Sequence, residues 1–226
     1  MLYTDSSPPF TLTTEADASD GGDPAEVSVR FSEPMTIDGS SDPAIGFNPN
    51  VDSTLPAAGA STVWAASDQF AWSTPEADAN VRVESVTVDV IGAKDAAGND
   101  QEPYSAVDEF DIDTVKPSVS AVGVDTDPMY EGDLVQLVTV TFDEVMDTAA
   151  DPVIAFGAGT FGSDGDGVWS AGDTVWKEMF TLMDNDEEIA AVTVEVTGAK
   201  DAAGNDQELH TPVDEFDIDT LAPTIT

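Results

Sequence analysis

The sequence predicts an all-β protein built from two tandem β-sandwiches. Three observations lead to this prediction: a long internal repeat, apolar residues that alternate with polar ones, and the lack of a capped helical stretch of about ten residues. The repeat is exact over GAKDAAGNDQE at 92–102 and 198–208, and over VDEFDIDT at 107–114 and 213–220. The two copies are 106 residues apart (198 − 92), which indicates two tandem domains rather than one large fold.

The domain boundaries follow from a proline-bearing motif that recurs between the repeats. Residues 5–9, DTVKP at 113–117 and DTLAP at 219–223 occupy matching linker positions, and each of these segments begins with aspartate and ends with proline. Proline fixes φ and pushes the preceding residue into an extended conformation, so these linkers are short and stiff. We therefore place the domains at 1–114 and 115–226, and we expect the chain to be part of a longer array.

The strands are predicted by a period of two in the apolar residues. In the first repeat the valines of 86–90 alternate with polar residues. Upstream, Val81 and Val83 fall on the opposite parity, which predicts a β-bulge near Glu84 and Ser85.

About seven strands are expected in each repeat. In the first repeat they lie at roughly 9–14, 26–32, 44–47, 63–66, 69–73, 81–91 and 107–113. About seven short strands in a domain of this length predict an immunoglobulin-like Greek-key β-sandwich. The four tryptophans are expected mainly in the two cores.

Composition limits the possible partners. The chain has 46 Asp and Glu against 6 Lys and Arg, for a net charge of −40. This balance excludes nucleic acid, which needs basic residues to neutralise its phosphates, and it disfavours anionic membrane surfaces. So much negative charge opposes a compact state unless salt screens it or specific metal ions bind it. The absence of cysteine excludes disulfides, thiolate zinc sites and thiol catalysis.

Several short motifs occur in the same order in both repeats. FSEPM at 31–35 corresponds to FDEVM at 142–146, DAAGN occurs at 95–99 and 201–205, and the closing strand runs into DTVKP or DTLAP. In these motifs the chain resembles the bacterial Ig-like repeats of giant RTX-type biofilm adhesins. The resemblance implies an extracellular extender, or stalk, at the cell surface. Such stalks are often stiffened by calcium. The resemblance further implies a monomer whose partners are neighbouring repeats of the same chain, with no membrane insertion in this part.

The sandwich fold, if assumed, gathers carboxylates at the pole where each domain begins. The second strand ends there and the loop between the last two strands lies there, so Glu144 comes beside Asp201 and Asn205, all facing the linker that carries Asp113. Hard oxygen ligands in a flexible loop suit Ca²⁺ better than Mg²⁺ or a transition metal. Solvated loop carboxylates are the alternative interpretation.

The predicted metal ligands form three groups. At the junction they are Asp113, Glu144, Asp201 and Asn205, with Asp111 and Asp206 near. At the N-terminal pole they are Asp5, Glu33, Asp95, Asn99 and Asp100. The loop after the first strand adds Asp17, Asp20 and Asp23, which are expected to approach the junction from the first domain.

Other possible sites have weaker support in the sequence. GSDGDGVWSAGD at 162–173 imitates part of an EF-hand through Asp164, Asp166 and Asp173, but its glycine is not at the position that an EF-hand requires, and a solvated turn is favoured.

No enzyme is predicted, because His210 is the only histidine and its counterpart in the first repeat is Tyr104. Two non-enzymatic rivals remain: a sugar- or protein-binding module with an exposed aromatic cluster at 157–176, and an acidic, salt-adapted spacer without specific metal.

Overall fold

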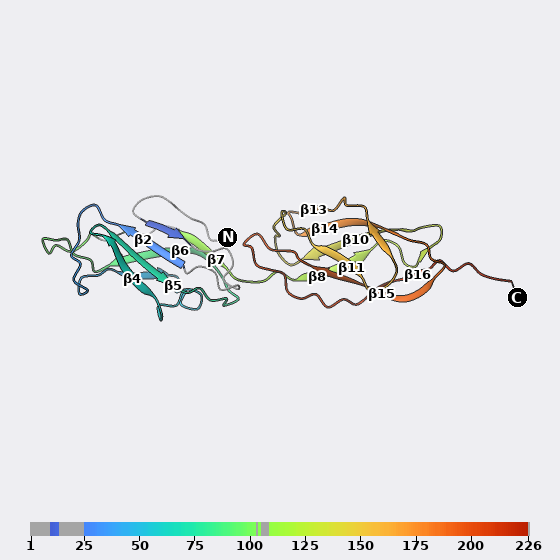
Figure 1. The fold of residues 1–226 in the computed structure, drawn as a ribbon, viewed down its shortest axis with the longest axis horizontal. Helices are drawn as coiled ribbons and strands as arrows, with labels where there is room; N and C mark the ends of the chain where they lie inside the picture. The colour runs from blue at the N-terminus through green and yellow to red at the C-terminus, as the bar shows by residue number, and fades with distance from the viewer. Residues whose placement is uncertain (1–9, 14–24, 103, 105–108, 226) are drawn as a thin grey trace. The chain divides into compact units, whose positions relative to one another are not determined.

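The chain consists of two compact units, Met1–Val115 and Lys116–Thr226 (Figure 1). The computed structural model describes residues 10–13, 25–102, 104 and 109–225. The unit boundary falls one residue after the position chosen from the sequence. All regular structure in the described residues is β, and no helix there could cross a membrane.

The first unit is a sandwich of a four-stranded and a three-stranded sheet, in the orders β1-β2-β5-β4 and β3-β6-β7. These orders are those of the ABED and CFG sheets of a constant-type immunoglobulin domain, so the immunoglobulin-like prediction is confirmed. The strands are β1 (Phe10–Thr13), β2 (Ala25–Arg30), β3 (Ala44–Asn48), β4 (Ser61–Ala66), β5 (Gln69–Thr74), β6 (Arg82–Ile91) and β7 (Phe110–Asp113).

The second unit follows the same plan with nine strands rather than the expected seven. One sheet has the order β12-β14-β10-β8, with β13 also paired to β14, and the other has the order β11-β15-β16-β9. The strands are β8 (Val119–Val124), β9 (Met129–Tyr130), β10 (Val135–Phe142), β11 (Val153–Phe156), β12 (Phe161–Ser163), β13 (Val168–Ser170), β14 (Val175–Leu182), β15 (Glu188–Thr197) and β16 (Asp214–Asp219).

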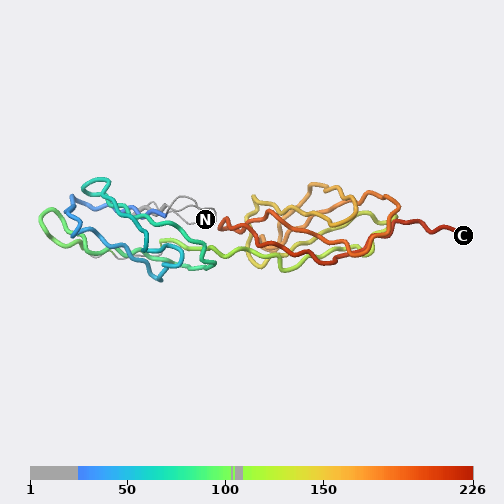
Figure 2. The backbone as a smooth tube through the Cα atoms, turned by 60° about the horizontal axis from the view of Figure 1, so that its bottom comes forward, coloured from blue at the N-terminus to red at the C-terminus, as the bar shows by residue number. Residues whose placement is uncertain are grey.

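The two extra strands arise from splitting. The first strand of the domain divides into β8, which pairs antiparallel with β10, and β9, which pairs parallel with β16. β12 and β13 both pair with β14, where the first unit has the single strand β4. In Figure 2 each unit is traced by long segments that turn back at its two ends.

Each core lies between the two sheets of its unit and is built from the alternating residues. In the second unit Val138, Val140 and Val194 have no exposed surface. Trp72 and Trp176 are buried, as expected for core residues. The other two tryptophans are half-buried with rings packed on core aromatics, and each donates its Nε1–H to an aspartate: Trp64 to Asp42 at 2.8 Å and Trp169 to Asp151 at 3.0 Å.

The predicted bulge in β6 is present and recurs in β15. The β6–β7 register shifts between Val83 and Val86, and the β15–β16 register shifts between Ile189 and Val192. Ser85 (φ 57°) and Ala191 (φ 63°) are the left-handed residues of the two bulges. An aspartate on the next strand accepts each backbone N–H: Asp111 Oδ1 from Ser85 at 2.7 Å and Asp217 Oδ1 from Ala191 at 2.8 Å.

Replacing Ala191 by glycine is expected to stabilise the second unit by about 1 kcal/mol, because the left-handed conformation strains an alanine and not a glycine. The neighbouring substitution Ala190→Gly is the control, and it should cost about 0.5–1 kcal/mol because it adds only backbone freedom. Urea unfolding of both variants measures the difference. A loss of stability in Ala191→Gly equal to that in Ala190→Gly would contradict the strain argument.

Candidate metal centre

The loop after β10 and the loop before β16 meet at one end of the second unit, as the sandwich fold predicted. Asp147 N–H donates to Lys200 O at 2.8 Å, and Ala202 N–H donates to Val145 O at 3.1 Å. The first unit repeats this pairing through Thr36 N–H and Lys94 O, 2.8 Å apart. The two loops therefore hold each other by main-chain bonds, which fixes the side chains that they carry.

The DAAGN loop of the second unit is closed by its own first and last residues. Asp201 Oδ1 accepts the Asn205 backbone N–H, and Asp201 Oδ2 accepts the Asn205 side-chain N–H, each at 2.8 Å. Gly204 adopts φ 100°, which a glycine provides without strain. Asp201 is only 1% exposed and Asn205 7%. The two predicted ligands therefore also shape the loop, a role that the sequence pattern does not indicate.

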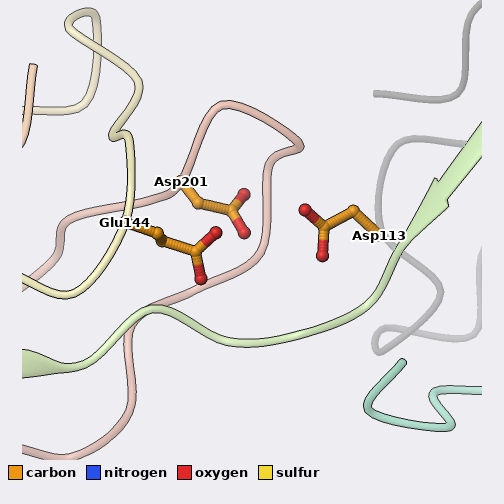
Figure 3. Close-up of side chains that lie close together, drawn as sticks. All are labelled: Asp113, Glu144 and Asp201. Atoms are coloured by element: carbon orange, nitrogen blue, oxygen red, sulfur yellow. The ribbon is translucent and has the colours of Figure 1, made fainter. Parts of the chain in front are cut away.

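Glu144 from the loop after β10 lies against Asp201 (Figure 3). A carboxylate oxygen of Glu144 and one of Asp201 are within 4.8 Å of each other. Two negative charges at this distance repel by about 1 kcal/mol in water and by about 3 kcal/mol at the effective dielectric of a protein surface. Because Asp201 is buried, water screens this pair poorly, and a bound cation would convert the repulsion into attraction.

Other charged groups around the pair have partners of their own. Lys200 Nζ lies 2.7 Å from Asp206 Oδ1 and donates to Gly204 O at 3.3 Å. Asp143 accepts hydrogen bonds from both the N–H and the hydroxyl of Ser118 at 2.8 Å. Asp206 is thus compensated by a lysine, and Asp143 anchors the segment that leads into β8.

The corresponding residues of the first unit also come together. Glu33, Asp95, Asn99 and Asp100 line one cleft of about 510 Å³. Hydrogen bonds from the Asn99 side chain, and then from its backbone, hold the pKa of Asp95 below its ordinary value. Asp100 forms an ion pair with Lys94. The four predicted ligands that can be described at this pole therefore share one cleft.

Two further predicted ligands lie on β7 of the first unit. Asp111 Oδ1 accepts the N–H of Ser85 in the bulge, as described above. Asp113 Oδ2 lies 2.7 Å from Arg82 Nη2, and Asp113 Oδ1 accepts the Val115 N–H at 3.1 Å. The predicted ligands Asp5, Asp17, Asp20 and Asp23 lie outside the described residues.

The segment at 157–176 packs its aromatic rings inward. Phe161 stacks on Phe156 with ring centroids 3.9 Å apart, and Trp169 meets Trp176 edge to face at 5.2 Å. The exposed aromatic cluster that a ligand-binding module would need is therefore not formed by the rings described in this stretch. Its aspartates Asp164 and Asp166 lie in the exposed turn between β12 and β13, as the solvated-turn interpretation expects.

Comparison with known proteins gives a structural likeness and no sequence match. No family model matches the chain, and no curated protein matches it. Among solved structures, the chain is similar to the D0-D1 domain of Intimin, with 13% sequence identity and a TM-score of 0.31. The match covers 90% of this chain and 93% of that one. The assignment of each unit to the immunoglobulin-like fold follows from its own strand order.

Proposed function

We propose that this chain is an extender module of a bacterial surface adhesin, stiffened by Ca²⁺ bound where one domain follows the next. The observation that leads to this proposal is the Glu144–Asp201 pair, two carboxylates within 4.8 Å of each other, one of them 1% exposed. A cation between the two carboxylates would relieve their mutual repulsion, and the chain has few lysines and arginines to supply one.

The donor set fits calcium. The groups available are carboxylate oxygens of Glu144 and Asp201 and main-chain carbonyls of the same loops, with no histidine or cysteine among the candidate ligands. Oxygen ligands from flexible loops suit the six to eight coordination positions of Ca²⁺, whereas Mg²⁺ demands a strict octahedron. Asp201 can accept its hydrogen bonds from Asn205 and still ligate a metal, because each carboxylate oxygen has two lone pairs.

Asp113 is proposed to complete the site from the linker. Asp113 lies five positions before Ser118 (118 − 113), and Ser118 is hydrogen-bonded to Asp143, the neighbour of Glu144. An extended chain of that length spans at most about 17 Å, so the linker is short enough for the third carboxylate to reach the other two. Its ion pair with Arg82 does not exclude calcium, because a carboxylate offers about four lone-pair positions.

The proposed role is mechanical. A calcium ion held by both the linker and the following domain would remove the hinge between them, and a string of such domains would become a rod that projects a distal adhesive domain. Extracellular modules bind calcium with dissociation constants of about 10⁻⁴ to 10⁻³ M. When the free calcium concentration is about ten times the dissociation constant, each site adds about 1.4 kcal/mol to folding stability. The chain would stiffen into a rod outside the cell, where calcium is millimolar, and would stay flexible inside, where free calcium is far lower.

The test is thermal unfolding of the chelated chain at fixed ionic strength, with calcium, magnesium or sodium chloride added back, combined with small-angle X-ray scattering. We expect calcium alone to raise the transition at millimolar concentration and to narrow the range of chain dimensions. An equal rise with every salt would favour the acidic, salt-adapted spacer, because screening does not distinguish cations. A rise in the transition with unchanged scattering would retain the calcium site and reject the rod.

A further inference from the structure

β8 is an edge strand whose own residues do not protect it from strand addition. It ends the sheet order β12-β14-β10-β8, so one row of its backbone N–H and C=O groups faces away from β10. Natural edge strands commonly carry lysine, proline or inward charges that prevent another strand from adding. Val119–Val124 carries none of these, and its exposed positions are Ser120, Ala121 and Gly123, which are small and uncharged.

A groove of about 500 Å³ runs along this edge. One wall is Ser118–Val122 and the other is the segment leading into β16, from Glu208 to Glu215. The Glu208 N–H donates to Pro117 O at 2.8 Å and ties the two walls together there. On the rim Leu209 is 85% exposed and Val213 is 61% exposed. The groove thus combines an open strand edge with two exposed apolar side chains.

The polar groups of this groove differ from their counterparts in the first unit. There, Tyr104 donates its hydroxyl to Glu109 Oε1 at 2.8 Å. The same two positions in the second unit hold His210 and Glu215 (104 + 106 and 109 + 106). His210 Nδ1 is buried and has no hydrogen-bond partner within the described part of the chain. Burial, and then the charge of Asp214, raise the pKa of Glu215. The first unit satisfies these positions internally, whereas the second does not.

We propose that the groove between β8 and the 208–215 segment binds an extended basic peptide of a partner protein, which adds to β8 as a further strand. Strand addition would use the open backbone edge, with alternate side chains of the peptide meeting Leu209 and Val213. Glu208 and Glu215 favour lysine or arginine in the peptide. A second copy of this chain is the less suitable occupant, because each copy has a net charge of −40. The inference does not depend on calcium binding.

The probe is a capped peptide of alternating lysine and valine, added to the whole chain at physiological ionic strength and read by amide hydrogen exchange. We expect about tenfold slower exchange confined to β8 amides. Two peptides serve as controls: one with alternate backbone nitrogens methylated, which keeps the charge and removes half of the donors, and one with glutamate for lysine. Equal binding of the methylated peptide would overturn strand addition in favour of general attraction to an acidic chain.

The matched variant is His210→Tyr, which recreates the Tyr104–Glu109 pair of the first unit. Its hydroxyl should bond to Glu215 and occupy the polar groups of the groove, which weakens peptide binding about tenfold while preserving the fold. Tyr104→Phe in the first unit is the control and should leave peptide binding unchanged. If His210→Tyr kept full affinity for the peptide, and if amide hydrogen exchange in the free variant showed that its strands were intact, the groove would be rejected as the binding site.

Discussion

Replacing Glu144 by glutamine is expected to stabilise the second unit without calcium and to remove most of its gain from calcium. In chelator the variant should be more stable by about 1–3 kcal/mol, because the repulsion between Glu144 and Asp201 is relieved. In millimolar calcium the unaltered chain gains a cation at this pair, whereas the variant loses a charged ligand and about 1.4 kcal/mol of the gain. Calcium should therefore narrow the difference in unfolding free energy between the two proteins, and it should reverse the difference if the variant is less than about 1.4 kcal/mol more stable in chelator.

Amide exchange of β10 and β14 reports the opening of the second unit and separates it from the first. The matched control is Glu33→Gln, which changes the corresponding exposed residue of the first unit and should leave exchange in β10 and β14 unchanged. Destabilisation by Glu144→Gln in chelator and in calcium alike would show that the glutamate has a packing or hydrogen-bonding role, and would contradict a metal site at this pair.

Replacing Gly167 by alanine is expected to destabilise the second unit by about 1–3 kcal/mol. A Cβ added at Gly167 would lie 1.9 Å from Cζ2 of Trp176, a ring that is only 4% exposed and packs against Trp169. The ring cannot move without disturbing the core that β13 and β14 cover. Urea unfolding measures the loss, and tryptophan fluorescence should shift as the ring is displaced.

Gly162 provides the control for this substitution. It lies in β12 of the same segment, and an added Cβ would meet nothing within 4 Å. Gly162→Ala should be neutral or stabilising by up to about 1 kcal/mol, because alanine restricts the unfolded chain. If the two alanine variants had equal stability, the prediction that an added Cβ at Gly167 clashes with Trp176 would be wrong.

The sequence was sufficient to predict the β-sandwich fold, because its apolar residues alternate with polar ones through long strands. The parity change between Val83 and Val86 was enough to locate the bulge in β6. The strands that it did not predict are β9 and β12, which have two and three residues and no measurable period, whereas β13 lies at Trp169, where the aromatic residues indicated a strand. For the same reason, nothing in the residue pattern of 157–176 indicates two short strands around Gly167 rather than one.

The candidate site was predictable only in outline. The repeated DAAGN motif pointed to Asp201 and Asn205, and the sandwich fold brought Glu144 to the same end. The part taken by Asp111 in the bulge depends on its register opposite Ser85, which a one-residue shift would abolish. The pairing of Lys200 with Asp206 is likewise a matter of loop geometry, so the sequence could not show which carboxylate of the loop pairs with the lysine.

The parallel pairing of β9 with β16 has a consequence for the order of folding. Ile218 pairs with Met129, and the Asp217 N–H donates to Asp127 Oδ1 across 90 residues of chain. A unit that closes through its last strand cannot complete its second sheet until nearly all of it has emerged from the ribosome. Contacts of such long range form slowly. The second unit would therefore fold as a whole only after its final residues appear.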